Sequence, residues 1–123
     1  MARLFVIALF FISCASGKMV ETNLYFGTSK PKGGVVSDPE WAQFKSEYVS
    51  QVFKEGSTQI AVIGNWYDPD KKAIIAEPTY ELIYFYKKNK EISRQIDSLA
   101  NRYKTKFDQQ SVLRADKRVR AKF

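Results

Sequence analysis

Few residues of this sequence have side chains that could take part in catalysis. The first candidates are two glutamates. Glu77 and Glu81 lie four positions apart in a segment with strand composition, so both would point to one face of a sheet. Paired carboxylates can act as general acid and base. A strand glutamate more often pairs with an arginine, and the candidate partners are Arg114, Arg118 and Arg120. A Glu77 carboxylate that is half-buried in an open pocket would favour a catalytic role. A carboxylate that is covered by an arginine side chain would favour a structural role.

Aromatic and polar side chains could join Glu77 in a small-ligand pocket. Tyr25, Trp66 and Gln109 are expected near one end of the sheet with it. Aromatic surface with a few polar groups is typical of small-ligand pockets. Tyr25 and Trp66 could equally be plain core residues, and no residue is assigned as catalytic.

The composition excludes several classes of site. The chain of 123 residues has no histidine and one cysteine, so His-dependent triads, His/Cys zinc sites and an intramolecular disulfide are excluded. We predict no metal and no cofactor. The net charge of +7 comes from dispersed basic residues and indicates solubility rather than a nucleic-acid partner. An aromatic signature of RNA-binding sheets is also missing, so no nucleic acid is expected.

Residues 1–13 have the parts of a secretory signal. Arg3 precedes an apolar run over residues 4–12, which is followed by small residues and is too short to span a bilayer. Residues 11–14 resemble a bacterial lipobox, with Phe11 where leucine is usual, which implies lipidation of Cys14. We therefore predict a signal peptide over 1–13, a tether over 14–21 and a lipid anchor in the bacterial envelope. A soluble secreted protein and a buried N-terminal strand are the alternatives.

Two helices are predicted from the spacing of apolar residues. The first begins at Ser37, with Glu40 at capping-box distance and Pro39 in the first turn, and ends before Gly56. Asn89 is expected to cap the second. The apolar stripes are Trp41, Phe44, Tyr48, Val52 and Phe53 in the first helix, and Ile92, Ile96, Leu99, Tyr103 and Phe107 in the second.

Four strands are predicted around these helices. Their ranges are 22–27, 58–67, 73–86 and 111–123, with a turn at 68–71, and Pro78 predicts a bulge or a break in the third. The order is that of an α+β, ferredoxin-like βαββαβ fold: a four-stranded antiparallel sheet with two helices on one face. Residues 22–123 should form this single domain.

The second face of such a sheet would be exposed in a monomer. Residues 60–63 and 82–86 are apolar on both sides of their strands, so we predict a homodimer through the sheet. Another partner, a ligand or the C-terminal tail could cover this face instead. The charged row Arg114, Arg118, Arg120 and Lys122 suggests a mixed interface or a wet rim.

Several segments together resemble domain of unknown function family 3574, a family of small exported bacterial proteins that are often lipoproteins. The matching segments are residues 21–27, 36–41 with Phe44, Gly64-Asn65-Trp66, Glu77 and 103–114. Residues 53–56 depart from the family, which usually has a proline there. The resemblance implies export and assigns no activity.

The sequence favours a non-enzymatic binding or interaction module held at the membrane. The alternative is a small enzyme or small-ligand-binding domain with its pocket between sheet and helices. The ligand is not identified by any motif.

Overall fold

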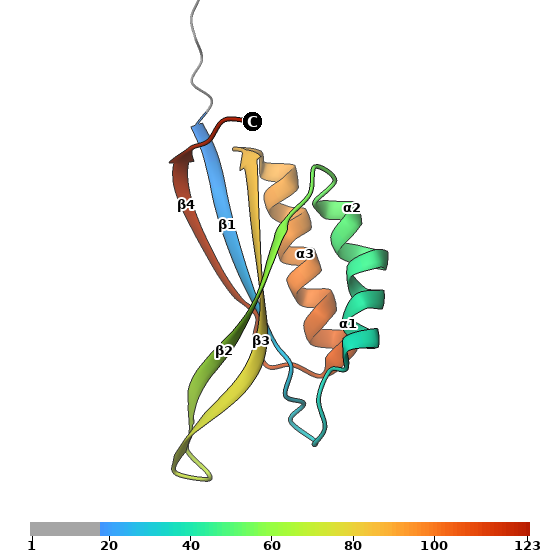
Figure 1. Cartoon of the computed structure of the whole chain (residues 1–123), viewed down its shortest axis with the longest axis vertical. Coiled ribbons are helices and arrows are strands. Elements are labelled where there is room, and N and C mark those ends of the chain that lie inside the picture. Colours follow the sequence, from blue (N-terminus) through green and yellow to red (C-terminus); the bar gives the residue numbers. More distant parts are fainter. Residues whose placement is uncertain (1–17) are drawn as a thin grey trace, which may run out of the picture.

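The computed structural model describes residues 18–123, and the predicted signal peptide and Cys14 lie outside this part of the chain. Its elements are β1 (Lys18–Gly27), α1 (Asp38–Phe44), the π-helical segment η1 (Lys45–Val49), α2 (Ser50–Val52), β2 (Thr58–Asp68), β3 (Ala73–Lys87), α3 (Lys90–Phe107) and β4 (Leu113–Arg120). The segments α1, η1 and α2 follow one another without interruption and form one helix, which runs beside α3 (Figure 1).

The four strands form one sheet in the order β2-β3-β1-β4, with every neighbouring pair antiparallel. Both helices lie on one face of this sheet (Figure 1). The predicted ferredoxin-like fold is thereby confirmed. The face away from the helices is called the open face below.

The first strand begins earlier than predicted. Residues 18–21, expected to belong to a tether, are the start of β1. Lys18 pairs with Arg120 of β4, and Met19 pairs with Lys87 of β3. The strand extends this far because both flanking strands offer it backbone partners.

Both predicted helix starts are confirmed. Ser37 Oγ accepts from the Glu40 amide at 3.3 Å, and the Glu40 carboxylate accepts from the Ser37 amide at 2.8 Å. This reciprocal pair satisfies donors that the helix start leaves without partners. The Asn89 side chain accepts from two amides at the start of α3, those of Glu91 and Ile92.

Aromatic side chains fill the space between sheet and helices. Trp41 and Phe44 from α1 and Tyr103 and Phe107 from α3 are all buried. Phe26 of β1 lies among them, with its ring centroid 4.8 Å from that of Tyr103 and 5.2 Å from that of Trp41. The predicted core is confirmed. Because it lies wholly within residues 18–123, this part of the chain can fold by itself.

Pro78 does not interrupt the pairing of β3 with β2, which continues through the pair Ile63 and Pro78. It marks instead the end of the pairing with β1, whose last partner in β3 is Thr79. The carbonyl of Pro78 accepts from the amide of Thr28, so its missing N–H faces the side from which β1 departs. The predicted bulge is wrong, and the predicted break occurs only toward β1.

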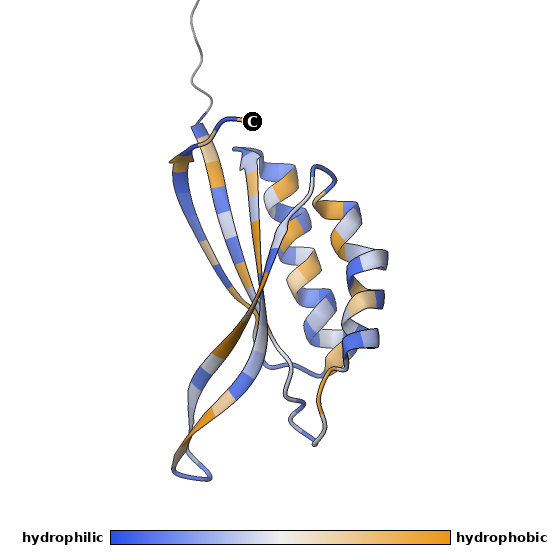
Figure 2. Ribbon diagram, viewed as in Figure 1, coloured by the Kyte–Doolittle hydropathy of each residue, from blue (hydrophilic) through white to orange (hydrophobic). Residues whose placement is uncertain are grey.

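Residues 63–78 extend beyond the end of β1 as a two-stranded hairpin, called the arm here (Figure 1). Figure 2 shows hydrophobic residues along both of its strands. Four large apolar side chains of the arm are exposed: Ile63, Trp66, Tyr67 and Ile74.

The charged row of β4 lies on the helix side of the sheet. Arg114 pairs in register with Leu24, and Arg118 pairs with Val20, both of which face the helices. The opposite row of β4 begins with Leu113, which is 62% exposed on the open face. The expectation that the charged row would line a sheet interface is therefore wrong, because alternation alone does not reveal which row meets the helices.

Candidate functional site

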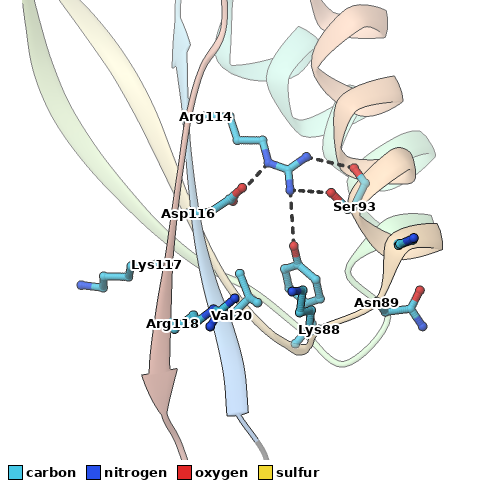
Figure 3. A pocket seen from close by; sticks show the side chains of 10 residues that line it. Val20, Lys88, Asn89, Ser93, Arg114, Asp116, Lys117 and Arg118 are labelled. Carbon is cyan, nitrogen blue, oxygen red and sulfur yellow. Dashed lines mark hydrogen bonds and ion pairs between the residues drawn. The ribbon is translucent and has the colours of Figure 1, made fainter.

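A cleft of about 340 Å³ opens between β4 and the start of α3 (Figure 3). Its lining residues are Val20, Tyr86, Lys88, Asn89, Lys90, Ser93, Arg114, Asp116, Lys117 and Arg118. The cleft thus combines one carboxylate with five basic side chains. Its position, between the sheet edge and a helix, is where the alternative ligand-binding hypothesis placed a pocket, although none of the residues predicted for that pocket lines it.

Arg114 forms the inner wall of this cleft and is fully engaged. Its guanidinium lies 2.6 Å from a carboxylate oxygen of Asp97 and 3.1 Å from one of Asp116. It also donates to the carbonyl and hydroxyl oxygens of Ser93 and to the hydroxyl of Tyr86 (Figure 3). Burial alone would lower the pKa of Arg114, but the hydrogen bonds and charges of the two aspartates outweigh it and raise the pKa. Arg114 therefore joins β4 to α3 and has little capacity left for a ligand.

Three cations at the cleft differ from Arg114. Lys88, Lys90 and Arg118 are exposed, and none of them forms an ion pair with another residue of 18–123. Lys117 pairs with Glu21 at 3.2 Å. Asp116 also accepts from the Thr22 hydroxyl, so the only carboxylate among the lining residues is held by two partners. These exposed cations give the cleft a net positive charge.

Tyr25 belongs to a different place. Its hydroxyl donates to Glu81 at 2.9 Å, and the Asn23 amide donates to the same carboxylate oxygen at 2.8 Å. The hydrogen bond to Glu81 is the main cause of a raised pKa of Tyr25. The register places these three residues on the open face, so Tyr25 is not a core residue between sheet and helices.

Glu77 and Gln109 are brought together by Ser29. The Glu77 carboxylate accepts from the Ser29 amide at 2.9 Å, and Gln109 donates to the Ser29 carbonyl at 2.8 Å. A Cβ atom on Gly27 would lie 2.9 Å from the Glu77 carboxylate, so the glycine makes room for it. Glu77 is half-buried and has no arginine partner, since Arg114 binds aspartates instead. The arginine-pairing interpretation of both strand glutamates is therefore wrong.

Trp66 lies on the arm with 44% of its surface exposed, which excludes a core role. Gly64 of β2 pairs with Glu77 of β3. Trp66 comes two residues after Gly64 in β2, so it lies on the same face of the sheet as Glu77. The predicted set of Tyr25, Trp66, Glu77 and Gln109 thus lies along the open face and its end, rather than between sheet and helices. Neither the cleft beside α3 nor a second cleft, which is lined by Gly56, Phe85 and Phe123 among others, includes any of the four.

The site residues missed by sequence reasoning are those of the cationic cleft. The sequence suggested Arg114 as a partner for strand glutamates or as part of a charged row at a sheet interface, whereas its partners Ser93 and Asp97 belong to α3. A usable signal was present in the chain: basic residues flank the cap of α3 and alternate along β4. Within residues 18–123, no cluster of carboxylate and thiol side chains could hold a metal ion. Of the helices in this part, none has both the length and the apolarity to cross a bilayer.

Comparisons with known proteins place the chain in a family and a fold. Residues 21–123 match the family model described as "Protein of unknown function (DUF3574)". A search of the curated proteins finds no match. Among solved structures, the chain is similar to a phage SAM lyase in complex with S-methyl-5'-thioadenosine, with a TM-score of 0.66 at 13% identity over 83% of this chain and 82% of that one.

Two further solved structures agree with this fold. The phage SAM lyase in its apo state gives a TM-score of 0.60 at 13% identity, again over 83% of this chain and 82% of that one. CutA from Synechococcus elongatus gives 0.52 at 9% identity, over 84% of this chain and 78% of that one. At such identities the likeness concerns the fold alone.

Proposed function

The chain belongs to the DUF3574 family of proteins of unknown function, and on that premise we propose that it is an exported, lipid-anchored envelope protein acting as a non-enzymatic interaction module. The anchor is supported by the sequence, in which an apolar run and small residues lead directly to Cys14. A diacylglyceryl and an amide-linked acyl chain on Cys14 would together provide firm attachment.

The observation that carries the interaction role is the apolar arm. Ile63, Tyr67 and Ile74 are each more than 60% exposed, although an isolated two-stranded hairpin is only marginally stable in water. Exposed apolar surface of this kind marks a binding site. The arm is therefore built to pack against another molecule.

We propose a second copy of the chain as the occupant. The open face offers apolar surface to the arm of that copy, including Ile60 and Leu113, which are 42% and 62% exposed. It also offers the carboxylates of Glu77 and Glu81, which have no cationic partner within residues 18–123. At its tip the arm carries Lys71, which pairs with Asp68 at 3.9 Å, and the exposed Lys72, which forms no ion pair within residues 18–123. The apolar surfaces of arm and open face could thus cover each other, with Lys72 free to meet a carboxylate of the open face, and a twofold axis would form this contact twice.

The anchor is tested in the native host. Intact mass of membrane-extracted protein should show a chain that starts at Cys14 and carries acyl groups, and Cys14→Ala should abolish the acylation and membrane retention. An unmodified chain that starts at Met1 would refute the anchor.

Self-association is tested by light scattering on residues 15–123 at high micromolar concentration. A dimer is expected, and Ile74→Lys should yield monomers because it places a charge in the apolar contact. Val35→Lys is the matched control, since Val35 is also 58% exposed but lies outside both the arm and the sheet. A wild-type monomer with nothing else bound would contradict the proposal.

A small-ligand site at Glu77 is the second candidate. It is favoured by the half-buried carboxylate of Glu77, which has no arginine partner and faces the side-chain-free positions of Gly27 and Gly64. Since the solved phage lyase holds S-methyl-5'-thioadenosine, that nucleoside is a reasonable probe. Calorimetry should detect binding that is lost in Glu77→Gln and retained in Glu81→Gln. Absence of heat with the wild-type dimer would argue against this candidate.

A further inference from the structure

Exposed basic side chains gather at one end of the domain. The start of β1, the ends of β3 and β4 and the start of α3 all lie at this end, opposite the arm (Figure 1). The exposed cations here, called the basic end, are Lys18, Lys87, Lys88, Lys90, Arg118, Arg120 and Lys122.

The charge of the basic end is not neutralised by neighbouring carboxylates. None of its residues forms an ion pair within residues 18–123. Four nearby acids are already engaged with other cations: Asp97 and Asp116 with Arg114, Glu21 with Lys117 and Glu91 with Arg94. Glu55, which lines a cleft together with Phe123, is exposed and outside these pairs, so it can offset only one of the seven cations. The segment that precedes Lys18 contains no acidic residue that could compensate.

The cleft beside α3 gives this charge a concave surface. Lys88, Lys90 and Arg118 line it, and the side chains of Asn89 and Ser93 add polar groups. Asp116 also lines the cleft but accepts from Arg114 and Thr22. A phosphate group that entered the cleft would meet three exposed cations that form no ion pair within residues 18–123.

The position of the predicted anchor favours a membrane phospholipid as the source of that phosphate. Only three residues separate Cys14 from Lys18, so over these four steps of the chain the two Cα atoms can be at most about 14 Å apart. A lipid on Cys14 would hold the basic end within roughly one or two Debye lengths of the bilayer surface. Phe123 is at the same end and 97% exposed, which offers an apolar side chain to the interface. If the basic end bound a soluble polyanion instead, its position beside the predicted anchor would have no explanation.

We propose that the basic end binds anionic membrane phospholipids and that the cleft of Lys88, Lys90 and Arg118 receives a headgroup phosphate. This inference rests on the proposed lipid anchor, which determines the end of the domain that faces the membrane. The contact adds to the anchor and fixes the orientation of the domain, so that the arm points away from the bilayer.

The test uses residues 15–123, which lack Cys14 and contain the whole core. Co-sedimentation with vesicles of phosphatidylglycerol is compared with vesicles of phosphatidylcholine. We expect binding to phosphatidylglycerol that falls as salt rises, and little binding to phosphatidylcholine. The double variant Lys88→Gln/Arg118→Gln should bind about 10- to 30-fold more weakly, from the loss of two cations at the surface.

The matched control is Lys32→Gln/Lys106→Gln, which removes the same charge from the opposite end of the domain and should bind like the wild type. Equal loss in both double variants would overturn the proposal, because net charge alone would then explain binding. Equal binding to both kinds of vesicle would also overturn it, as would binding to soluble polyphosphate but not to phosphatidylglycerol vesicles. The anchor is judged separately by the mass of the native protein, so either idea can fail while the other stands.

Discussion

The hydroxyl of Tyr103 donates a hydrogen bond to the carbonyl of Gly27 over 2.7 Å, which joins the buried face of α3 to the last residue of β1. Burial raises the pKa of Tyr103 well above the ordinary value, so this hydroxyl is protonated at every physiological pH. The bond lies next to the position where β1 leaves the sheet and where Glu77 contacts Ser29.

Tyr103→Phe should destabilise the domain by about 1–2 kcal/mol, because the Gly27 carbonyl would lose its side-chain donor inside the core. Urea unfolding followed by fluorescence would measure the change. Tyr48→Phe is a suitable control, since Tyr48 is only partly buried and no hydrogen bond of its hydroxyl is present within residues 18–123. Equal stability of wild type and Tyr103→Phe would contradict this prediction.

Gly27→Ala should destabilise the protein by roughly 1–3 kcal/mol, since the added Cβ would lie 2.9 Å from the Glu77 carboxylate. Removing the carboxylate should relieve the collision. In a double-mutant cycle, Gly27→Ala combined with Glu77→Ala should therefore cost less than the two single changes together. Strict additivity in denaturant unfolding would show that the two residues do not contact each other.

Trp41→Ala and Phe107→Ala should each cost about 3–5 kcal/mol, because both side chains are almost fully buried between sheet and helices. Trp41 additionally donates to Gln59 at 3.0 Å. Calorimetric melting would measure the losses. Values below about 1 kcal/mol at both positions would mean that the helices present other faces to the sheet.

The capping carboxylate of Glu40 makes stability depend on pH. Its hydrogen bonds with the Ser37 amide and with Lys30 hold its pKa below the ordinary value of a glutamate side chain. A carboxyl with a lowered pKa in the folded state stabilises the protein above its unfolded pKa, and this contribution is lost as the pH falls through the folded pKa. The stability of the wild type should therefore fall toward that of Glu40→Gln between about pH 5 and about pH 3.

Urea midpoints at several pH values would measure this convergence. Glu55→Gln, which lies beyond the other end of the same helix and outside the capping box, controls for the loss of a carboxylate as such. A gap between wild type and Glu40→Gln that does not change with pH would exclude the capping carboxylate as its origin.

Local signals explain why the elements could be predicted from the sequence. Ser37, Glu40 and Asn89 act within one helical turn, so their spacing alone reveals the helix starts. The apolar stripes with Trp41 and Phe107 have the helical period and indicate the core face. From these elements and their order, the fold class followed.

Long-range pairings explain what could not be predicted. Alternation along β4 shows that Arg114 and Leu113 face opposite ways, but only the position of α3 decides which of them faces the helices. The exposure of Trp66 depends on β1 ending at Gly27, opposite Thr79, which leaves the arm without a third strand. Such information lies in contacts between distant segments, and a single sequence does not display it.

The central position of β1 has a consequence for the order of folding. This strand is the first described element of the chain, yet its two neighbours are β3 and β4, the last strands to be synthesised. The pair Lys18 and Arg120 joins nearly the two ends of the described chain, and such distant contacts are costly to close and slow to form. A growing chain can therefore pair β2 with β3 early, but it cannot complete the sheet until its final residues are available.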